Sequence, residues 1–219
     1  MKKIFILSLA VLSLFSSCDK ETENNSFITH YVDLQLKGDK VMSQKLGTTF
    51  VDPGFTAEEN GQDVAGNVKV SGSVDTNTPG AYKLTYQIAN ADGYSAVATR
   101  LICVNNPQTL EGVFMIYAGR PGGTTYNTYI SIAKTEEEGV YSVDCLLGAW
   151  YSIGRNYGKD CAGAGHIKVA DDGTISLVDG YVPYWDAEVT SLEGSFDKET
   201  GTFKWTTVWN DYTFTVESM

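Results

Sequence analysis

Apolar and polar residues alternate with a period of two along most of the chain after residue 26, and clusters of Gly, Asn and Asp interrupt the alternation at short intervals. Residues 82–88 and 203–209 show it most clearly, with Tyr, Leu or Ile at every second position of the first run and Phe, Trp, Thr and Trp at those of the second. Successive side chains of a strand point to opposite faces, so this pattern predicts strands with one buried face. Helical periodicity is almost absent after the N-terminus, and the predicted fold class is all-β.

Turn residues between alternating runs predict two hairpins. The runs 167–169 and 175–177 are separated by a turn at 171–173 that ends in Asp-Gly, a sequence typical of tight hairpin turns. Residues 196–203 predict a second hairpin with a longer loop. The glycine-rich segment 119–123 lacks the lysine and the helix start of a phosphate-binding loop, and it also predicts a hairpin loop.

The first residues have the organisation of an export signal. Lys2 and Lys3 precede an apolar run over residues 4–15, which is too short to span a bilayer as a mature helix. The run ends at Ser-Ser-Cys18, and residues 14–18 resemble the lipobox of Bacteroidetes lipoproteins, although Phe15 stands where an aliphatic residue is usual. The resemblance implies a signal peptide over 1–17 and acylation of Cys18, which would anchor the chain to a membrane. The alternative is an ordinary secretory signal with an incidental cysteine.

Residues 18–26 contain acidic and polar side chains and no large apolar residue before Phe27, so we expect a solvated tether after the lipidated cysteine. An acidic stretch directly after that cysteine resembles the surface-export signal of Bacteroidetes lipoproteins. It implies an outer-membrane protein, lipid-anchored and facing the cell exterior. A plain tether that faces the periplasm is the alternative.

Pro and Asn between two blocks of strands mark a linker at residues 105–108. We therefore predict one domain over 27–104 and a second over 107–219. Together with the tether they make about 200 mature residues, a comfortable length for two β domains.

The first domain resembles the bacterial immunoglobulin-like surface domains. Residues 48–57 (TTFVDPGFTA) match the motif of that family around Asp-Pro-Gly, and residues 74–86 (VDTNTPGAYKLTY) match its later glycine and tyrosine segment. Two departures are Asn90-Ala-Asp-Gly93 in place of an aspartate-rich turn and Cys103 in place of an aliphatic residue. The resemblance implies an immunoglobulin-like β-sandwich, with Tyr82 and Tyr86 packed inside, that acts as a spacer or stalk.

The second domain resembles, through residues 192–206, the C-terminal domains of Bacteroides lipoproteins linked to glycan-utilisation loci. In those proteins a strand, an acidic hairpin and a Trp-bearing strand end a small β-barrel or sandwich. The predicted architecture is therefore an immunoglobulin-like β-sandwich followed by a second antiparallel β-barrel or sandwich domain.

Charge and cysteine content narrow the chemistry. The net charge of -11, which becomes -13 when Lys2 and Lys3 leave with the signal peptide, repels phosphate backbones, so we expect no nucleic-acid partner. Cys103 lies in an apolar run and reads as a small buried hydrophobe. Cys145 and Cys161 could form a disulfide or stay free. Cysteine spacing gives no metal site, and we expect no cofactor.

Catalytic motifs are missing from the sequence. The two histidines, His30 and His166, read as surface or strand residues, and no GxSxG, HExxH or P-loop occurs. Paired carboxylates could hydrolyse glycosidic bonds, and candidates lie in predicted loops: Asp144, Asp160, Asp186 and Glu188. Acidic residues in such loops are mostly solvated, so we expect no catalytic residue and no enzyme.

Two segments combine aromatic rings with planar polar groups, the pairing that binds sugar rings through stacking and hydrogen bonds. The candidate ligand-binding residues are Trp150, Tyr151, Arg155, Tyr157, Tyr184 and Trp185. The alternative for Trp150 and Trp185 is that they close the ends of the second domain's core. The same side chains also suit a protein partner.

The function predicted from the sequence is a non-enzymatic cell-surface lipoprotein that binds or helps to capture glycans, with a polysaccharide or an outer-membrane importer complex as partner. A structural or assembly component that binds another surface protein is the alternative, and a hydrolase is the third.

Overall fold

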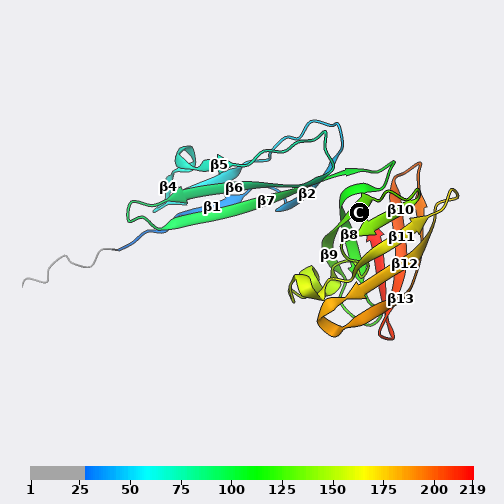
Figure 1. Cartoon of the computed structure of the whole chain (residues 1–219). Coiled ribbons are helices and arrows are strands. Elements are labelled where there is room, and N and C mark those ends of the chain that lie inside the picture. The colour runs from blue at the N-terminus through cyan, green and yellow to red at the C-terminus, as the bar shows by residue number, and fades with distance from the viewer. Residues whose placement is uncertain (1–27) are drawn as a thin grey trace, which may run out of the picture. The chain divides into compact units, whose positions relative to one another are not determined.

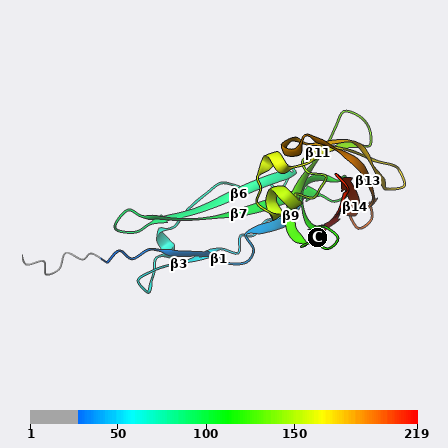
Figure 2. The ribbon, with the colours of Figure 1, turned by 90° about the horizontal axis from the view of Figure 1, so that it is seen from below.

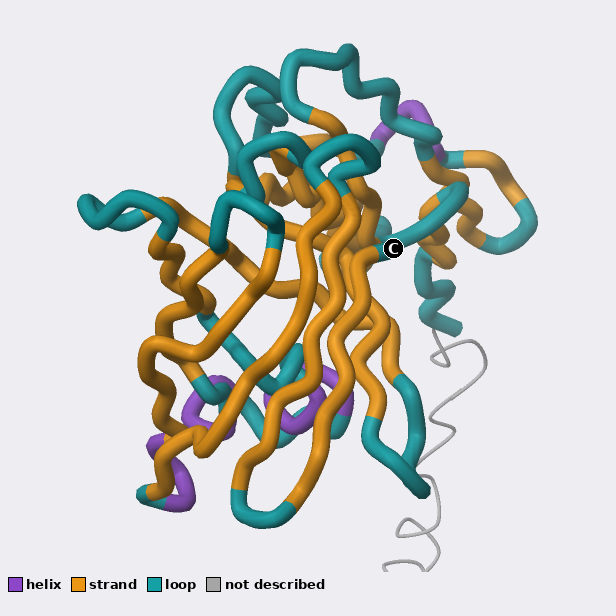
Figure 3. Tube along the Cα trace, turned by 90° about the vertical axis from the view of Figure 1, so that its right-hand side faces the viewer, coloured by secondary structure: helices purple, strands orange, loops and turns teal. Residues whose placement is uncertain are grey.

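The computed structural model describes residues 28–219, and these residues form an N-terminal β-sandwich followed by a closed β-barrel (Figure 1). Strands make up most of the trace, and helical turns are short (Figure 3). None of the helices in this described range is long and apolar enough to cross a membrane. The predicted signal peptide 1–17, the lipidation site Cys18 and the tether 18–26 lie outside the described residues.

The sandwich has two sheets, which Figure 2 shows as separate layers, with β1 and β3 in one and β6 and β7 in the other. The first sheet has the order β1-β3-β4, and the second joins β5, β6, β7 and β2, with β2 parallel to β7. The elements are β1 (Asp33–Leu36), β2 (Val41–Lys45), β3 (Phe55–Glu59), β4 (Gln62–Asp63), η2 (Ala65–Asn67), β5 (Lys69–Ser71), β6 (Gly80–Ala89) and β7 (Ser95–Asn106).

The alternating residues of β6 and β7 form the core of the sandwich. Leu84 and Tyr86 from β6 pack with Ile102 and Val104 from β7, and all four are buried. Tyr82 packs against the edge of this cluster, so both tyrosines lie where the resemblance placed them. Cys103 is also fully buried, as the apolar run around it predicted.

A buried ion pair fixes the Asp-Pro-Gly motif to the second sheet. The guanidinium of Arg100, which is 0% exposed, lies with Nε 3.2 Å from Oδ1 of Asp52. Asp52 also accepts hydrogen bonds from the hydroxyl of Tyr86 (2.7 Å) and the backbone N–H of Gly54 (3.1 Å). The two terminal nitrogens of Arg100 donate to the carbonyls of three residues at 2.8–2.9 Å, Lys37, Asp39 and Gly54, and Nη1 also donates to Sδ of Met42 at 3.3 Å. The motif is therefore a structural clamp that satisfies a buried charge.

The second domain is an eight-stranded antiparallel barrel, which confirms the predicted fold class. The last strand, β15, closes the barrel by pairing with the first, β8, from Thr215↔Gly119 to Ser218↔Ile116. The strands are β8 (Glu111–Gly119), β9 (Tyr126–Lys134), β10 (Val140–Val143), β11 (Ala164–Val169), β12 (Thr174–Val182), β13 (Ala187–Asp197), β14 (Thr202–Trp209) and β15 (Tyr212–Ser218).

The predicted hairpins are confirmed. Val169 pairs with Ile175 around the Asp-Gly turn, and Phe196 pairs with Phe203 around the longer loop. The predicted inward positions of β14 are buried, and their side chains are Phe203, Trp205, Thr207 and Trp209. Residues 105 and 106 of the predicted linker continue β7 and pair with the start of β8.

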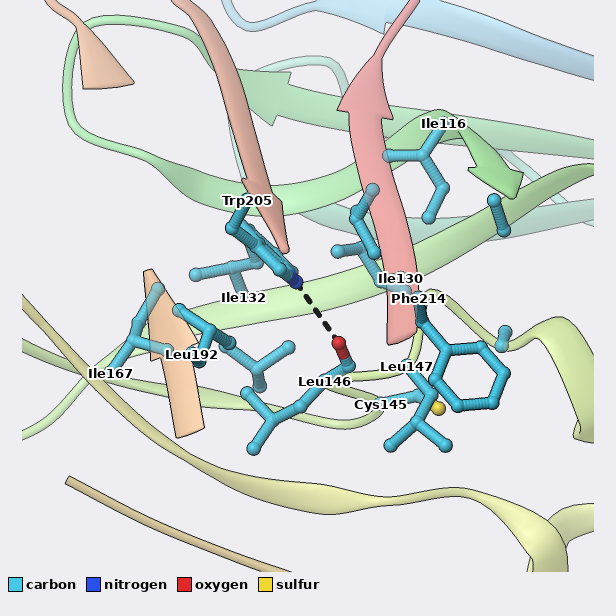
Figure 4. Packing of buried hydrophobic residues seen from close by; sticks show 14 of the residues in the cluster. Ile116, Ile130, Ile132, Cys145, Leu146, Leu147, Ile167, Leu192, Trp205 and Phe214 are labelled. Atoms are coloured by element: carbon cyan, nitrogen blue, oxygen red, sulfur yellow. Dashed lines mark hydrogen bonds between the residues drawn. The ribbon is translucent and has the colours of Figure 1, made fainter. Parts of the chain in front are cut away.

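A long connection between β10 and β11, residues 144–163, folds into the barrel and fills its interior. The carbonyl of Leu146 accepts hydrogen bonds from Nε1 of Trp205 (3.0 Å) and from the hydroxyl of Thr207 (2.6 Å), and Figure 4 shows the first of these among the buried side chains. Gly148 adopts φ +65°, and a Cβ there would lie 2.7 Å from Val216. The backbone can approach the wall so closely only because this position is glycine.

Strand direction sorts the connections of the barrel between its two ends. The chain enters the barrel at the start of β8, and β8 finishes at the other end, which we call the distal end. Antiparallel pairing brings four connections to the distal end: 120–125, 144–163, 183–186 and 210–211. They carry the π-helical turn η3 (Trp150–Gly154) and the 3-10 turns η4 (Lys159–Cys161) and η5 (Pro183–Trp185).

Candidate ligand-binding site

Aromatic side chains from these distal connections and the adjoining strand ends pack into one group with two arginines. We call this group the distal cluster, and its members are Arg120, Tyr126, Trp150, Tyr151, Arg155, Tyr157, Tyr184, Trp185, Trp209, Tyr212 and Phe214. The six binding residues predicted from the sequence are all in it. Two segments about 30 residues apart in the sequence thus meet at one end of the barrel.

Tyr151 lies at the centre of the distal cluster. Its ring centroid is 4.7 Å from that of Trp150, 4.9 Å from Trp185 and 5.9 Å from Tyr157, with the last pair stacked. Tyr184 extends the row, since its centroid lies 4.9 Å from that of Trp185. Such contacts contribute about 0.5–1.5 kcal/mol per pair beyond burial, so the rings hold one another in place.

Members of the distal cluster divide into a buried floor and an exposed rim. Trp150, Trp209 and Phe214 are at most 2% exposed and belong to the barrel core. Tyr157 is 52% exposed and Tyr184 67% exposed, so these two offer their rings to solvent. Trp150 therefore closes the core, as one of the two interpretations expected, and its indole N–H donates to the carbonyl of Thr124 at 2.8 Å.

The backbone around the rim adopts unusual conformations. Ala149, Asn156 and Asp186 have φ values of 55°, 56° and 49°, in the left-handed region that non-glycine residues rarely occupy. Ala149 immediately precedes η3, and π-helical turns of this kind are frequent at functional sites. Strained backbone of this sort costs about 1–3 kcal/mol per residue and persists where the surrounding packing imposes it. These three residues directly adjoin Trp150, Tyr157 and Trp185 of the distal cluster.

Both arginines stack on rings of the cluster. Cζ of Arg120 lies 3.7 Å from the ring centroid of Tyr212, and Cζ of Arg155 lies 5.4 Å from those of Trp150 and Tyr157. Arg120 also donates to the hydroxyl of Tyr151 at 3.4 Å, and Arg155 to that of Tyr157 at 3.2 Å. Burial raises the pKa of the Tyr151 phenol above its ordinary value.

One buried donor of the cluster has no partner. Among the residues that the structure describes, two buried side-chain polar atoms lack a hydrogen bond, Oγ1 of Thr109 and Nε1 of Trp209. A buried unpaired N–H costs about 1–3 kcal/mol. The cluster thus keeps a polar group that a core selected for stability alone would have satisfied.

The disulfide that Cys145 and Cys161 could have formed is absent. Both residues are buried free thiols, and each has its own backbone contact. The sulfur of Cys145 accepts from the N–H of Gly163 at 3.3 Å, whereas the thiol of Cys161 lies 3.9 Å from the carbonyl of Tyr157. The connection between them is held by its packing inside the barrel, without a covalent bridge.

Three of the four carboxylates considered for catalysis are engaged locally. Asp144 accepts from the N–H of Ser131 at 2.9 Å, Asp160 lies 3.9 Å from the ammonium of Lys159, and Asp186 accepts from the hydroxyl of Tyr181. His166 lies on β11 with Nδ1 2.8 Å from Oδ1 of Asp179. Within residues 28–219, no group of three or more His, Cys, Asp or Glu side chains could hold a metal ion.

A shallow groove on the barrel wall, across β12 to β15, is a weaker candidate. Its exposed side chains are polar, and its apolar residues, Ile175, Trp205 and Val216, are buried. It offers no exposed ring for a sugar and no strained backbone. The distal cluster has both, and we therefore take it as the candidate site.

The sequence analysis missed several members of the distal cluster. Arg120 was assigned to a hairpin loop, and Tyr126, Trp209, Tyr212 and Phe214 were not considered as site residues. Trp209 and Tyr212 flank a two-residue turn, and Arg120 lies at the end of β8. Once β8 and β15 are paired, these strand ends have to meet. These residues could therefore have been found only by predicting that the strands close into a barrel, which brings the end of β8 next to the start of β15.

Family models match both parts of the chain. A model described as the Ig-like domain of bacterial surface proteins matches residues 34–104. A second model, described as a C-terminal domain, matches residues 105–218. The two matches cover the sandwich and the barrel in turn, so the fold and its family models define a bacterial surface protein with an Ig-like domain followed by a β-barrel domain.

One solved structure matches this whole arrangement. The lipoprotein BT2262 from Bacteroides thetaiotaomicron is 32% identical, with a TM-score of 0.60 over 86% of this chain and 99% of that chain. The chain therefore belongs to the family of this Bacteroides lipoprotein.

Other comparisons add little. The structure of CBM51-2 in complex with GlcNAc and INT domains from Clostridium perfringens ZmpB matches with a TM-score of 0.29 and 15% identity, over 86% of this chain and 44% of that chain. That likeness is too low to bear on fold or function. The comparison with curated proteins gave no match.

Proposed function

We propose that this surface lipoprotein is a non-enzymatic glycan-capture module, and that the rim of the distal cluster contacts the sugar. Lipid anchored in the outer membrane and facing the exterior, it would serve an importer complex by holding polysaccharide near the cell. The observation that carries the proposal is the exposed pair Tyr157 and Tyr184, held on a buried aromatic floor beside Arg155.

The chemistry of the rim fits sugar binding. A sugar ring presents C–H groups on its faces, which pack on aromatic rings, and hydroxyls at its edge, which need planar hydrogen-bonding groups. Because the rim rings are held by neighbouring rings and strained backbone, little side-chain freedom is lost on binding. The end where the chain enters the barrel is the opposite end, so the rim stays free of that connection.

A non-enzymatic role is supported by the state of the acidic residues. Asp144, Asp160 and Asp186 each have a local partner, and His166 is paired on the barrel wall with Asp179. Hydrolysis of a glycoside requires two carboxyl groups on either side of the bond. The distal cluster presents rings and guanidinium groups instead.

The test is affinity electrophoresis against a panel of plant, host and microbial polysaccharides, followed by calorimetry with any ligand found. Tyr184→Ala and Tyr157→Ala should each weaken binding about 10-fold or more, since stacking on an exposed ring is lost. Tyr117→Ala is the matched control, because Tyr117 is 45% exposed on the barrel wall outside the cluster. Absence of binding to every glycan, together with a stoichiometric protein partner recovered from membranes, would favour the assembly role instead.

A further inference from the structure

We infer that the ligand of the distal cluster is an anionic sugar, whose carboxylate or sulfate is bound by Arg155 and Arg120; this rests on the proposed function. The chain has only three arginines among its 16 basic residues. One of them, Arg100, is buried in the sandwich and paired with Asp52. The other two both lie in the distal cluster.

Neither cluster arginine is neutralised by the protein. The ion pairs among residues 28–219 involve Arg100, Lys134, Lys159 and His166, and none involves Arg120 or Arg155. Both guanidinium charges therefore stay available to an anionic ligand in a chain whose net charge is -11.

Nearby acidic residues are directed elsewhere. Asp160 and Asp186 are on the same connections as the rim rings, but Asp160 lies beside Lys159 and Asp186 accepts from Tyr181. Asp211 is exposed in the turn before Tyr212 and makes no ion pair with either arginine. The two positive charges therefore remain together on the same indole, with Cζ 5.7 Å (Arg120) and 5.4 Å (Arg155) from the ring centroid of Trp150.

The geometry leaves the right atoms free. Stacking uses the flat face of a guanidinium and leaves its N–H groups pointing outward in the plane. Arg120 and Arg155 each donate one N–H to a tyrosine hydroxyl, and their other guanidinium N–H groups have no acceptor among the described residues. Two parallel N–H groups match the two oxygens of a carboxylate or sulfate.

An anionic sugar would contact both the exposed rings of the rim and the arginine beside them. The ring of the sugar would lie on Tyr157 or Tyr184, which are exposed, and its acidic group would reach Arg155, which is exposed and packs against Tyr157. Arg120 is half-buried and positions the rim through Tyr212 and Tyr151 while adding positive charge. The ligand class is thus a uronic-acid polysaccharide or a sulfated one.

The test is a glycan array with neutral, uronic-acid and sulfated polysaccharides, using the protein without its predicted signal peptide 1–17. Calorimetry then compares the best acidic ligand with its neutral derivative, carboxyl-reduced for a uronic acid and desulfated for a sulfate ester. We expect the acidic form to bind and the neutral form to bind at least 10-fold more weakly. The derivative that loses binding identifies which acidic group is recognised.

Variants separate a specific site from general charge. Arg155→Gln should lower affinity about 10-fold or more, Arg155→Lys should fall in between, and raised salt should weaken the wild type. Lys159→Gln removes the same charge from the same connection, at a side chain that is 95% exposed, and should change nothing. Near-ultraviolet circular dichroism checks that each variant keeps its fold.

The outcomes distinguish this inference from the proposed function. Binding of neutral glycans only, or acidic binding that Arg155→Gln leaves unchanged, would overturn the inference while glycan capture stands. Binding of no glycan at all would end both.

Discussion

Replacing Arg100 by Met should unfold the sandwich far more easily than any surface substitution. The change removes the partner of Asp52 and the donors to three backbone carbonyls, while its side chain fills a similar volume. Breaking a buried ion pair from one side costs about 3–5 kcal/mol, because the other charge stays behind unpaired. Asp52 is 30% exposed, and water partly solvates it. We therefore expect a loss of about 4 kcal/mol, a large share of the roughly 5–15 kcal/mol by which folded domains are stable.

The chain offers an internal reference for this measurement. Its four tryptophans are at positions 150, 185, 205 and 209, all in the barrel, so tryptophan fluorescence reports the barrel alone. In urea, the sandwich transition seen by circular dichroism should move down by roughly 2–4 M in Arg100→Met, at a slope of about 1–2 kcal/mol per M. The fluorescence transition should stay in place.

Two further variants complete the experiment. Lys83→Met on β6 removes an exposed charge and should leave both transitions unchanged. Asp52→Asn keeps the shape of the carboxylate but leaves the charge of Arg100 without an anionic partner, so it should also destabilise the sandwich. An Arg100→Met sandwich within 1 kcal/mol of the wild type would refute the clamp and make the pair a neutral feature of the core.

Two other predictions concern the barrel and the thiols. In denaturant without reductant, Ellman's reagent should titrate three thiols in residues 28–219, and a single reactive thiol would show that Cys145 and Cys161 form a disulfide after all. In the native state at pH 8, Cys103 should stay unreactive, because burial raises its pKa to about 12. Gly148→Ala should lower the free energy of unfolding of the barrel by about 1–3 kcal/mol, since the new Cβ would meet Val216 at 2.7 Å. Gly122→Ala is its control, because Gly122 lies in the barrel with a similar φ of +71° and open space at its Cβ, and equal urea midpoints for the two variants would contradict the close fit.

Local sequence patterns predicted the strands well, because the direction of a side chain in a strand and the formation of a tight turn depend on residues close in the sequence. The alternation over 82–88 and 203–209 and the Asp-Gly turn before Ile175 each determine side-chain direction or a tight turn directly. The rim residues Tyr157 and Tyr184 were found from composition, since they lie in segments rich in rings and polar groups.

The remainder depended on long-range geometry. Arg120 and Tyr212 are neighbours only because β15 pairs with β8, which no local pattern reveals. The sequence left open whether Cys145 and Cys161 are bridged, because spacing says nothing of side-chain direction, and the structure has both as buried free thiols. Arg100 did have a signal: it shares a strand face with Ala98 and Ile102, so a charge on the core side required a partner.

The closure of the barrel by its last strand has a consequence for biogenesis. Because β8 obtains its second neighbour from residues 215–218, and Leu146 obtains its hydrogen bonds from β14, an emerging chain lacks these contacts until its C-terminus appears. Pairings between distant segments form late and slowly. Truncation by even a few C-terminal residues should therefore leave the polypeptide open to proteases.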